Sequence, residues 1–187
     1  MRAAALAQAM VVVDVQRGWV EGAHAVHGAD DLLDRLSAGL AAARAAGALV
    51  VHLQDVGDAD SSVAPGTAGR QLALAPLPDE HVIRKTVDDG FAETDLERRL
   101  RAAGVESVVI GGLQSEMCVA STVRAALARQ FSVILPRDAH ATHDIPASDG
   151  VPQVPAAQVR RVAEWSLGDE IVVVSGIADV TFEQPAG

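Results

Sequence analysis

The sequence predicts an α/β fold in three layers, with a mainly parallel β-sheet between two layers of helices. Two observations predict it. Short β-branched segments alternate with helical segments along most of the chain, a pattern typical of parallel strands joined by helices. The chain also contains only two Trp, three Phe and no Tyr among many Ala, Val and Leu residues, which favours buried parallel strands over a β-sandwich.

The first strand and helix are predicted from a change in the spacing of apolar residues. Met10–Val15 is an apolar run interrupted only by Asp14, as expected of a strand buried on both faces. Asp30–Ala46 then carries its leucines at helical spacing on one face, and Gly47 is a typical residue for the end of that helix.

The next segments repeat the alternation. Ala48–Leu53 and His81–Arg84 are predicted as the second and third strands. Thr94 and Glu97 have the spacing of a capping box, in which the side chain of each residue accepts a hydrogen bond from the backbone N–H of the other residue. They predict the start of a helix that ends at Gly104.

The second half of the chain completes the predicted sheet. Val108–Ile110 is the fourth expected strand, and a helix is expected over about Met117–Arg129. Phe131–Leu135 is the fifth strand, Pro155 introduces a further helix, and Ile171–Val174 is the sixth strand.

The length of the chain predicts one domain over residues 1–187, because independent domains usually contain about 100–200 residues. The stretches 54–79 and 136–154 have no periodicity. Long irregular segments inside a domain are often functional, so both are candidate walls or lids of a pocket, although plain surface loops would give the same pattern.

Composition excludes several functions. A formal net charge of −10 without a basic stripe argues against a nucleic-acid partner. No run approaches the roughly 18 apolar residues of a membrane helix, so we expect no membrane partner. The single cysteine excludes an intrachain disulfide and suits a reducing compartment, so we expect a cytoplasmic location.

Three reactive side chains stand out near the carboxyl ends of predicted strands. Asp14 lies in the first strand, Lys85 ends the third, and Cys118 follows the fourth where a helix is expected to begin. Ligands of open parallel sheets bind outside the carboxyl ends of the strands, so the three positions predict one site. Taken singly, each residue type more often has a structural role, such as a packed cysteine or a solvated lysine.

These three residue types also fit one mechanism. A nearby ammonium and the positive end of a helix favour a thiolate, so Lys85 and the expected helix start would activate Cys118. Asp14 would take the thiol proton and return it to a leaving nitrogen.

The motifs around these residues resemble those of the isochorismatase-like cysteine hydrolases, which include nicotinamidases, N-carbamoylsarcosine amidases, ureidoacrylate hydrolases and streptothricin hydrolases. The resemblance covers most of the chain, and it assigns the catalytic triad of the family to Asp14, Lys85 and Cys118. The matching segments are Val11–Gln16, Ile83–Thr86, Gly90–Phe91, Thr94–Leu96 and Gly111–Val119, with Thr122 in the helix that follows.

The resemblance implies a six-stranded sheet in the order 3-2-1-4-5-6. It implies a cis peptide bond between Leu113 and Gln114, and an oxyanion hole formed by the backbone N–H groups of Gln114 and Cys118. It also implies a homodimer or homotetramer.

The chain departs from the family at two places. Nicotinamidases bind a divalent metal through an Asp-x-His pattern, and the corresponding segment here is Asp55-Val56-Gly57, so we expect no bound metal and no cofactor. Many members have a Trp where Arg70 follows Gly69, and we hypothesise that Arg70 pairs with a substrate carboxylate, although a solvated loop arginine is the simpler reading.

Several further residues are assigned by expectation. The candidate substrate-pocket residues are Gln16, Trp19, Arg70 and Phe91. Two H-x-x-H pairs, His24 with His27 and His140 with His143, are expected to be surface histidines rather than metal ligands.

The sequence therefore predicts a hydrolase that cleaves a carbon–nitrogen bond, in an amide, carbamoyl or imide group of a small molecule, through a thioester on Cys118. One alternative is vinyl-ether hydrolysis of isochorismate, which needs no cysteine. A second is a catalytically idle family member that acts as an interaction protein. A third, a nucleotide-binding or flavin-binding module, lacks the usual glycine-rich motif between Gln16 and Asp30.

Overall fold

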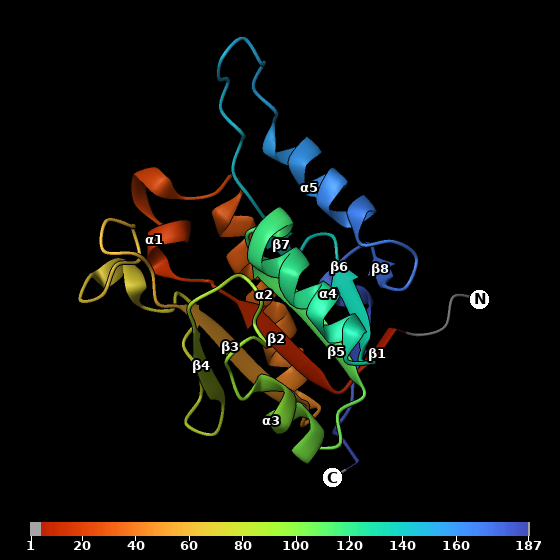
Figure 1. Cartoon of the computed structure of the whole chain (residues 1–187). Coiled ribbons are helices and arrows are strands. Elements are labelled where there is room, and N and C mark those ends of the chain that lie inside the picture. Colours follow the sequence, from red (N-terminus) through yellow and green to blue (C-terminus); the bar gives the residue numbers. More distant parts are fainter. Residues whose placement is uncertain (1–4, 187) are drawn as a thin grey trace.

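The structure is a computed structural model that describes residues 5–186, and it has a parallel sheet with helices on both faces (Figure 1). Residues 1–4 and 187 of the expected domain lie outside the described residues. No helix within 5–186 combines the length and the apolar character that crossing a membrane requires.

The main sheet has the strand order β4-β3-β2-β5-β6-β8, and all of its pairs are parallel. In chain order this is the predicted order 3-2-1-4-5-6, which is therefore confirmed. A short strand, β7, pairs with the end of β5. The bounds are β2 (Ala9–Val13), β3 (Leu49–Asp55), β4 (His81–Lys85), β5 (Ser107–Leu113), β6 (Ser132–Pro136), β7 (His140–Ala141) and β8 (Val172–Val174).

Helix α2 covers one face of the sheet, and α3 and α4 cover the other (Figure 1). The hairpin-like segment 144–155 and helix α5 extend beyond the sheet at the top of the view. The helices are α1 (Arg17–Val20), α2 (Ala29–Ala45), α3 (Leu96–Ala102), α4 (Ala120–Ala128) and α5 (Ala156–Ser166), and short helical turns span Gly22–His24, Ala68–Arg70 and Ile177–Asp179.

The two cores explain why β2 is apolar at every position. Side chains alternate across a strand, so Val11 and Val13 of β2 pack with α3 and α4, while Met10 and Val12 pack with α2. Burial on both faces leaves no position in β2 for a polar residue.

One local prediction is wrong in part, and one pair of strands was not predicted. The expected capping box is formed only in part: the Thr94 hydroxyl accepts the N–H of Leu96 (3.3 Å) and donates to Gly90 O (2.7 Å), whereas Glu97 pairs with Arg129 (3.1 Å). Helix α3 begins at Leu96, and the side chain of Asp95 does not cap it. A second, two-stranded sheet was not predicted, and it joins β1 (Ala5–Ala7) to β9 (Val180–Phe182).

Gly112 is required where β5 passes β2. Its φ is +125°, and a Cβ atom there would overlap Val13 O. We expect Gly112→Ala to lower the free energy of unfolding in urea by about 2–4 kcal/mol, since both strain and overlap oppose the side chain.

Gly22 provides the matched control for this prediction. It also has a positive φ (+69°), but nothing lies within 4 Å of its Cβ position. Gly22→Ala is expected to cost only the backbone strain, about 1 kcal/mol. Equal losses in the two variants would contradict the role assigned to the close strand contact.

Candidate active site

The structure brings Asp14, Lys85 and Cys118 together at the carboxyl edge of the sheet. Lys85 Nζ lies 2.7 Å from Asp14 Oδ2 and 3.2 Å from Cys118 Sγ. The sequence predicted that Asp14 lies inside the first strand, and this is wrong. β2 ends at Val13, and Asp14 follows it with a left-handed φ of 52°. This turn places the carboxylate at the strand end rather than on a fully packed face of the sheet.

Lys85 is the cation at the centre of this group. It is the last residue of β4 and only 2% exposed, and its ammonium also donates to Val87 O at 3.2 Å. Burial lowers the pKa of Lys85, but its interactions with Asp14 and Cys118, by charge and by hydrogen bond, outweigh burial and raise that pKa overall. Lys85 therefore stays an ammonium.

Burial controls the pKa of Asp14. It raises that pKa to about 6, although the ion pair with Lys85 and the contact with the Cys118 thiol lower it partway. The like charge of Asp55 contributes to this increase. A carboxyl group with this pKa is suited to accept and return a proton near neutral pH.

The Cys118 thiol is not activated in the way the sequence suggested. Burial raises its pKa, the negative charge of Asp14 raises it further, and Lys85 only partly opposes these effects. The resting group is therefore a neutral thiol, which must lose its proton during attack rather than before it.

The backbone around Cys118 also differs from the regular helix that the sequence predicted. Ser115–Val119 forms a wide helical turn in which Met117 has non-helical φ and ψ of −106°, and regular helix α4 begins only at Ala120. Cys118 therefore precedes α4 instead of opening it. The peptide bond between Leu113 and Gln114 is cis in this structure.

Buried polar contacts attach this turn to β7. The Ser115 hydroxyl and His140 Nδ1 are hydrogen-bonded at 2.8 Å, and the Thr142 hydroxyl donates to Glu116 at 2.9 Å. His140 is only 1% exposed, so the expectation of a surface histidine is wrong there. Burial lowers its pKa to about 3, which keeps the imidazole neutral.

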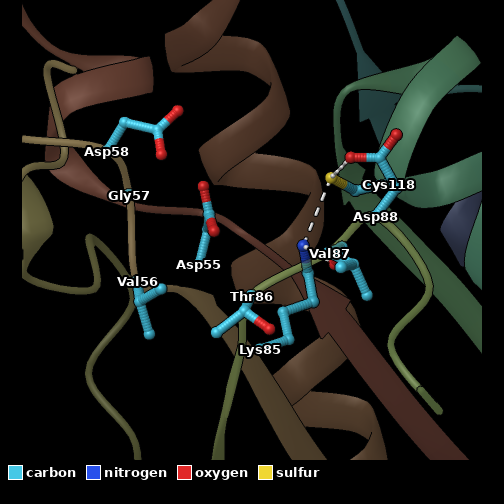
Figure 2. A pocket seen from close by; sticks show the side chains of 9 residues that line it. All are labelled: Asp55, Val56, Gly57, Asp58, Lys85, Thr86, Val87, Asp88 and Cys118. Carbon is cyan, nitrogen blue, oxygen red and sulfur yellow. Dashed lines mark hydrogen bonds between the residues drawn. The ribbon is translucent and has the colours of Figure 1, made fainter. Parts of the chain in front are cut away.

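A cavity of about 190 Å³ opens beside Lys85 and Cys118 (Figure 2). One side of it comes from the end of β3 and the segment that follows, and the other from the segment after β4. The lining residues are Asp55, Val56, Gly57, Asp58, Lys85, Thr86, Val87, Asp88 and Cys118. Part of the irregular stretch 54–79 therefore forms a wall of the candidate site.

None of the four residues predicted for the substrate pocket lines this cavity. The buried Gln16 side chain hydrogen-bonds Asp55 O and Arg70 O, and Trp19 packs edge-on against His143. Arg70 contributes this carbonyl group, and its guanidinium is not part of the wall.

Phe91 is a core residue, stacked on Phe131 with ring centroids 6.0 Å apart. Sequence reasoning missed the acidic lining instead. The available signal was the position of these residues: Asp55 is the last residue of β3, and Asp88 lies three residues after the end of β4.

The metal site implied by some family members does not fit these residues. Gly57 stands where the metal-binding histidine would be, with a φ of +68°, and a Cβ atom there would lie 2.7 Å from Val63 O. Across residues 5–186 there is no group of three or more His, Cys, Asp and Glu residues arranged to hold a metal ion.

Comparisons with known proteins place the chain in a family. The isochorismatase domain matches residues 8–151. A streptothricin hydrolase of Streptomyces noursei is 53% identical over 95% of this chain and 66% of its own length. A ureidoacrylate amidohydrolase of Variovorax paradoxus is 30% identical over 73% of this chain and 69% of its own length. The chain thus spans about two thirds of these relatives.

Solved structures agree with this placement. An isochorismatase from Pseudomonas putida KT2440 is similar with a TM-score of 0.85 and 27% identity, covering 92% of this chain and 90% of that one. A cysteine hydrolase from Pseudomonas syringae pv. phaseolicola has a TM-score of 0.82 and 29% identity, covering 94% and 90%. The chain therefore belongs to the isochorismatase-like hydrolase family.

Proposed function

We propose that this protein is a cysteine hydrolase that cleaves an amide-type carbon–nitrogen bond of a small molecule through a thioester on Cys118. One observation carries the proposal: the Lys85 ammonium contacts both the Cys118 sulfur and the Asp14 carboxylate beside an open cavity. A nucleophile, a base and a cation for the thiolate are the groups that such a reaction requires.

The first half of the proposed reaction forms the thioester. The thiol gives its proton to Asp14 as the sulfur attacks the carbonyl carbon, and Lys85 stabilises the negative charge on the sulfur. By family resemblance, the backbone N–H groups of Gln114 and Cys118 bind the oxyanion of the tetrahedral intermediate. Asp14 then protonates the leaving nitrogen as the carbon–nitrogen bond breaks.

The second half releases the acid. Water attacks the thioester carbonyl and gives a proton to Asp14, and the carbon–sulfur bond breaks. The departing sulfur takes that proton back, so the acid is released and the thiol is restored. The amine and the acid together contain the atoms of the substrate and one water.

The relatives support an amide-type substrate, since two of them are a streptothricin hydrolase and an amidohydrolase by name. Four further expectations remain part of the proposal: one domain over residues 1–187, a homodimer or homotetramer, a cytoplasmic location, and activity without a metal or cofactor.

Alkylation tests the covalent mechanism. Prolonged treatment with excess iodoacetamide at pH 8 is expected to modify Cys118, the only cysteine, slowly because its resting thiol is neutral, and to abolish hydrolysis in proportion to the modified fraction. Peptide mass spectrometry gives that fraction, and activity against a panel of amides, ureas and carbamoyl compounds gives the loss. Full activity after complete modification would rule out the thioester.

The pH dependence follows from Asp14. Only the ionised carboxylate can accept the thiol proton, so kcat/KM is expected to rise with pH along a limb with an apparent pKa close to 6. Below that value the rate should fall about tenfold per pH unit. Because Asp14, Lys85 and Cys118 are coupled, the apparent pKa belongs to the group of three.

Initial rates at saturating and limiting substrate between pH 4.5 and 8 measure this limb. Circular dichroism over the same range serves as the control for unfolding. A kcat/KM that is constant from pH 5 to 7, or that falls as pH rises through 6, would contradict the role of Asp14 as the base.

A further inference from the structure

We infer that the cavity selects substrates with a positively charged group close to the scissile bond, and that Asp55 and Asp58 are the residues that bind this group. The inference rests on the proposed function, because the cavity contains the proposed nucleophile and whatever fills it is the substrate. It adds the charge of the substrate, which the triad itself does not determine.

The charges around the cavity are unbalanced. Three carboxylates, those of Asp55, Asp58 and Asp88, line it, and Lys85 is its only cationic lining residue. Lys85 is already paired with Asp14 at 2.7 Å. Its positive charge is therefore largely neutralised by a carboxylate that does not line the cavity. Figure 2 shows Asp55 and Asp58 on one side of the opening and Asp88 next to Cys118 on the other.

The protein itself does not neutralise these carboxylates. The ion pairs formed by residues 5–186 involve other acidic residues and leave out Asp55, Asp58 and Asp88. Asp88 has a local role, since its Oδ1 accepts the Cys118 thiol hydrogen at 3.4 Å. Asp55 and Asp58 are therefore the two acidic side chains available to a ligand.

Asp55 is held in place by a buried side chain. Gln16, which is fully buried, accepts a hydrogen bond from Asp55 N (2.9 Å) and donates one to Asp55 O (3.0 Å). The next residue, Val56, donates its N–H to Lys85 O at 3.1 Å. This arrangement fixes the wall that carries the carboxylates relative to Lys85, as a binding site for a charged group requires.

A resident metal ion does not explain the acidic wall. The residue that would complete a metal site is Gly57, whose backbone conformation and close contact with Val63 O leave no room for a side chain. The positive partner of Asp55 and Asp58 is therefore assigned to the substrate. An ammonium or guanidinium group suits two neighbouring carboxylates through charge-assisted hydrogen bonds.

Two amides with the same number of heavy atoms test this inference. γ-Aminobutyramide carries an ammonium group, and γ-hydroxybutyramide carries a hydroxyl at the same place. A second pair, ε-aminocaproamide and its hydroxyl analogue, has a longer chain between the amide and the terminal group. We expect wild-type kcat/KM to favour the ammonium member of a pair by about tenfold or more, since charged hydrogen bonds are the strong ones. The preference should decrease at high ionic strength.

Asp58→Asn is the main variant, because Asp58 is exposed and lies outside the Asp14–Lys85–Cys118 group. It is expected to reduce the ammonium preference to about threefold or less, mainly by raising KM for the ammonium amides more than for the hydroxyl amides. Asp58→Lys should reverse the preference. Asp60→Asn is the matched control, since Asp60 is an exposed acidic residue of the same segment that does not line the cavity.

Three results would overturn the inference. They are equal wild-type kcat/KM for both members of every pair, an equal effect of Asp58→Asn on both members, and loss of activity in EDTA that Mn²⁺ or Zn²⁺ restores. Calorimetric binding of each pair to Cys118→Ala gives a readout without turnover, and equal affinities there also overturn it. Failure of the proposed function is distinct, because the wild type and Cys118→Ala would then hydrolyse the panel equally.

Discussion

Cys118→Ala is expected to lower kcat/KM for amide hydrolysis by about ten-thousand-fold or more, the scale seen when the nucleophile of a catalytic triad is removed. The sulfur is the only atom of the cavity wall that is both nucleophilic and in contact with Lys85. Without it neither the thioester nor the contact that stabilises its formation can exist. Rates under single-turnover conditions measure the loss.

The fold should tolerate this change. Cys118 is partly exposed and lies in a turn that Ser115 and Gln114 hold through contacts that do not involve the sulfur. The free energy of unfolding in urea should therefore change by about 1 kcal/mol or less. Activity within about tenfold of the wild type in the pure variant would contradict the covalent mechanism.

Lys85→Met is expected to damage both activity and stability. The substitution keeps an apolar stem but removes the charge that faces the thiolate, so kcat/KM should fall about a thousandfold. It also leaves Asp14, which is 3% exposed, without its cation. Removing one partner of a buried ion pair costs about 3–5 kcal/mol of unfolding free energy.

The stability loss in Lys85→Met should depend on pH. The pKa of Asp14 is already raised above its unfolded value in the wild type, and losing Lys85 raises it further. A group with a raised folded pKa contributes stability at low pH that is lost as pH rises through that pKa. The variant should therefore be closest to the wild type near pH 5 and furthest from it near pH 8.

Arg84→Met is the matched control for Lys85→Met. Arg84 is the neighbouring cation of the same strand, but it is exposed and forms no ion pair within the described part of the chain. Its replacement should change the unfolding free energy by about 0.5 kcal/mol or less and leave kcat/KM nearly unchanged. Urea titrations at pH 5 and pH 8 give the comparison, and equal losses in both Met variants would contradict the buried pair.

Much of the fold was predictable because its signals are local. The apolar run at Met10–Val13 and the helical spacing of the leucines in Ala29–Ala45 each indicate one element without help from the rest of the chain. The pairing of Ala5–Ala7 with Val180–Phe182 was not predictable, because it joins short segments from opposite ends of the chain. Such a pairing depends on tertiary contacts rather than on local preference.

The group Asp14, Lys85 and Cys118 was predictable in its members, but neither its geometry nor the lining of the cavity was. Asp14 stands out because it interrupts the apolar run Met10–Val15, whereas the wide turn at Ser115–Val119 has no signal, since Glu116, Met117 and Ala120 all favour a regular helix. In the sequence, the acidic residues of the cavity, Asp55, Asp58 and Asp88, cannot be distinguished from ordinary solvated loop residues. Only the packing of β3 beside β4 brings Asp55 and Asp88 to the same cavity.

The most direct test of the proposed mechanism is intact-protein mass spectrometry after rapid acid quench of the enzyme mixed with a cleavable amide. The wild type should gain the mass of the acyl group within the first turnover, and peptide mapping should place it on Cys118. The adduct should disappear on treatment with hydroxylamine, which cleaves thioesters. Efficient turnover with no adduct at any quench time, or an adduct that persists in Cys118→Ala, would contradict the account.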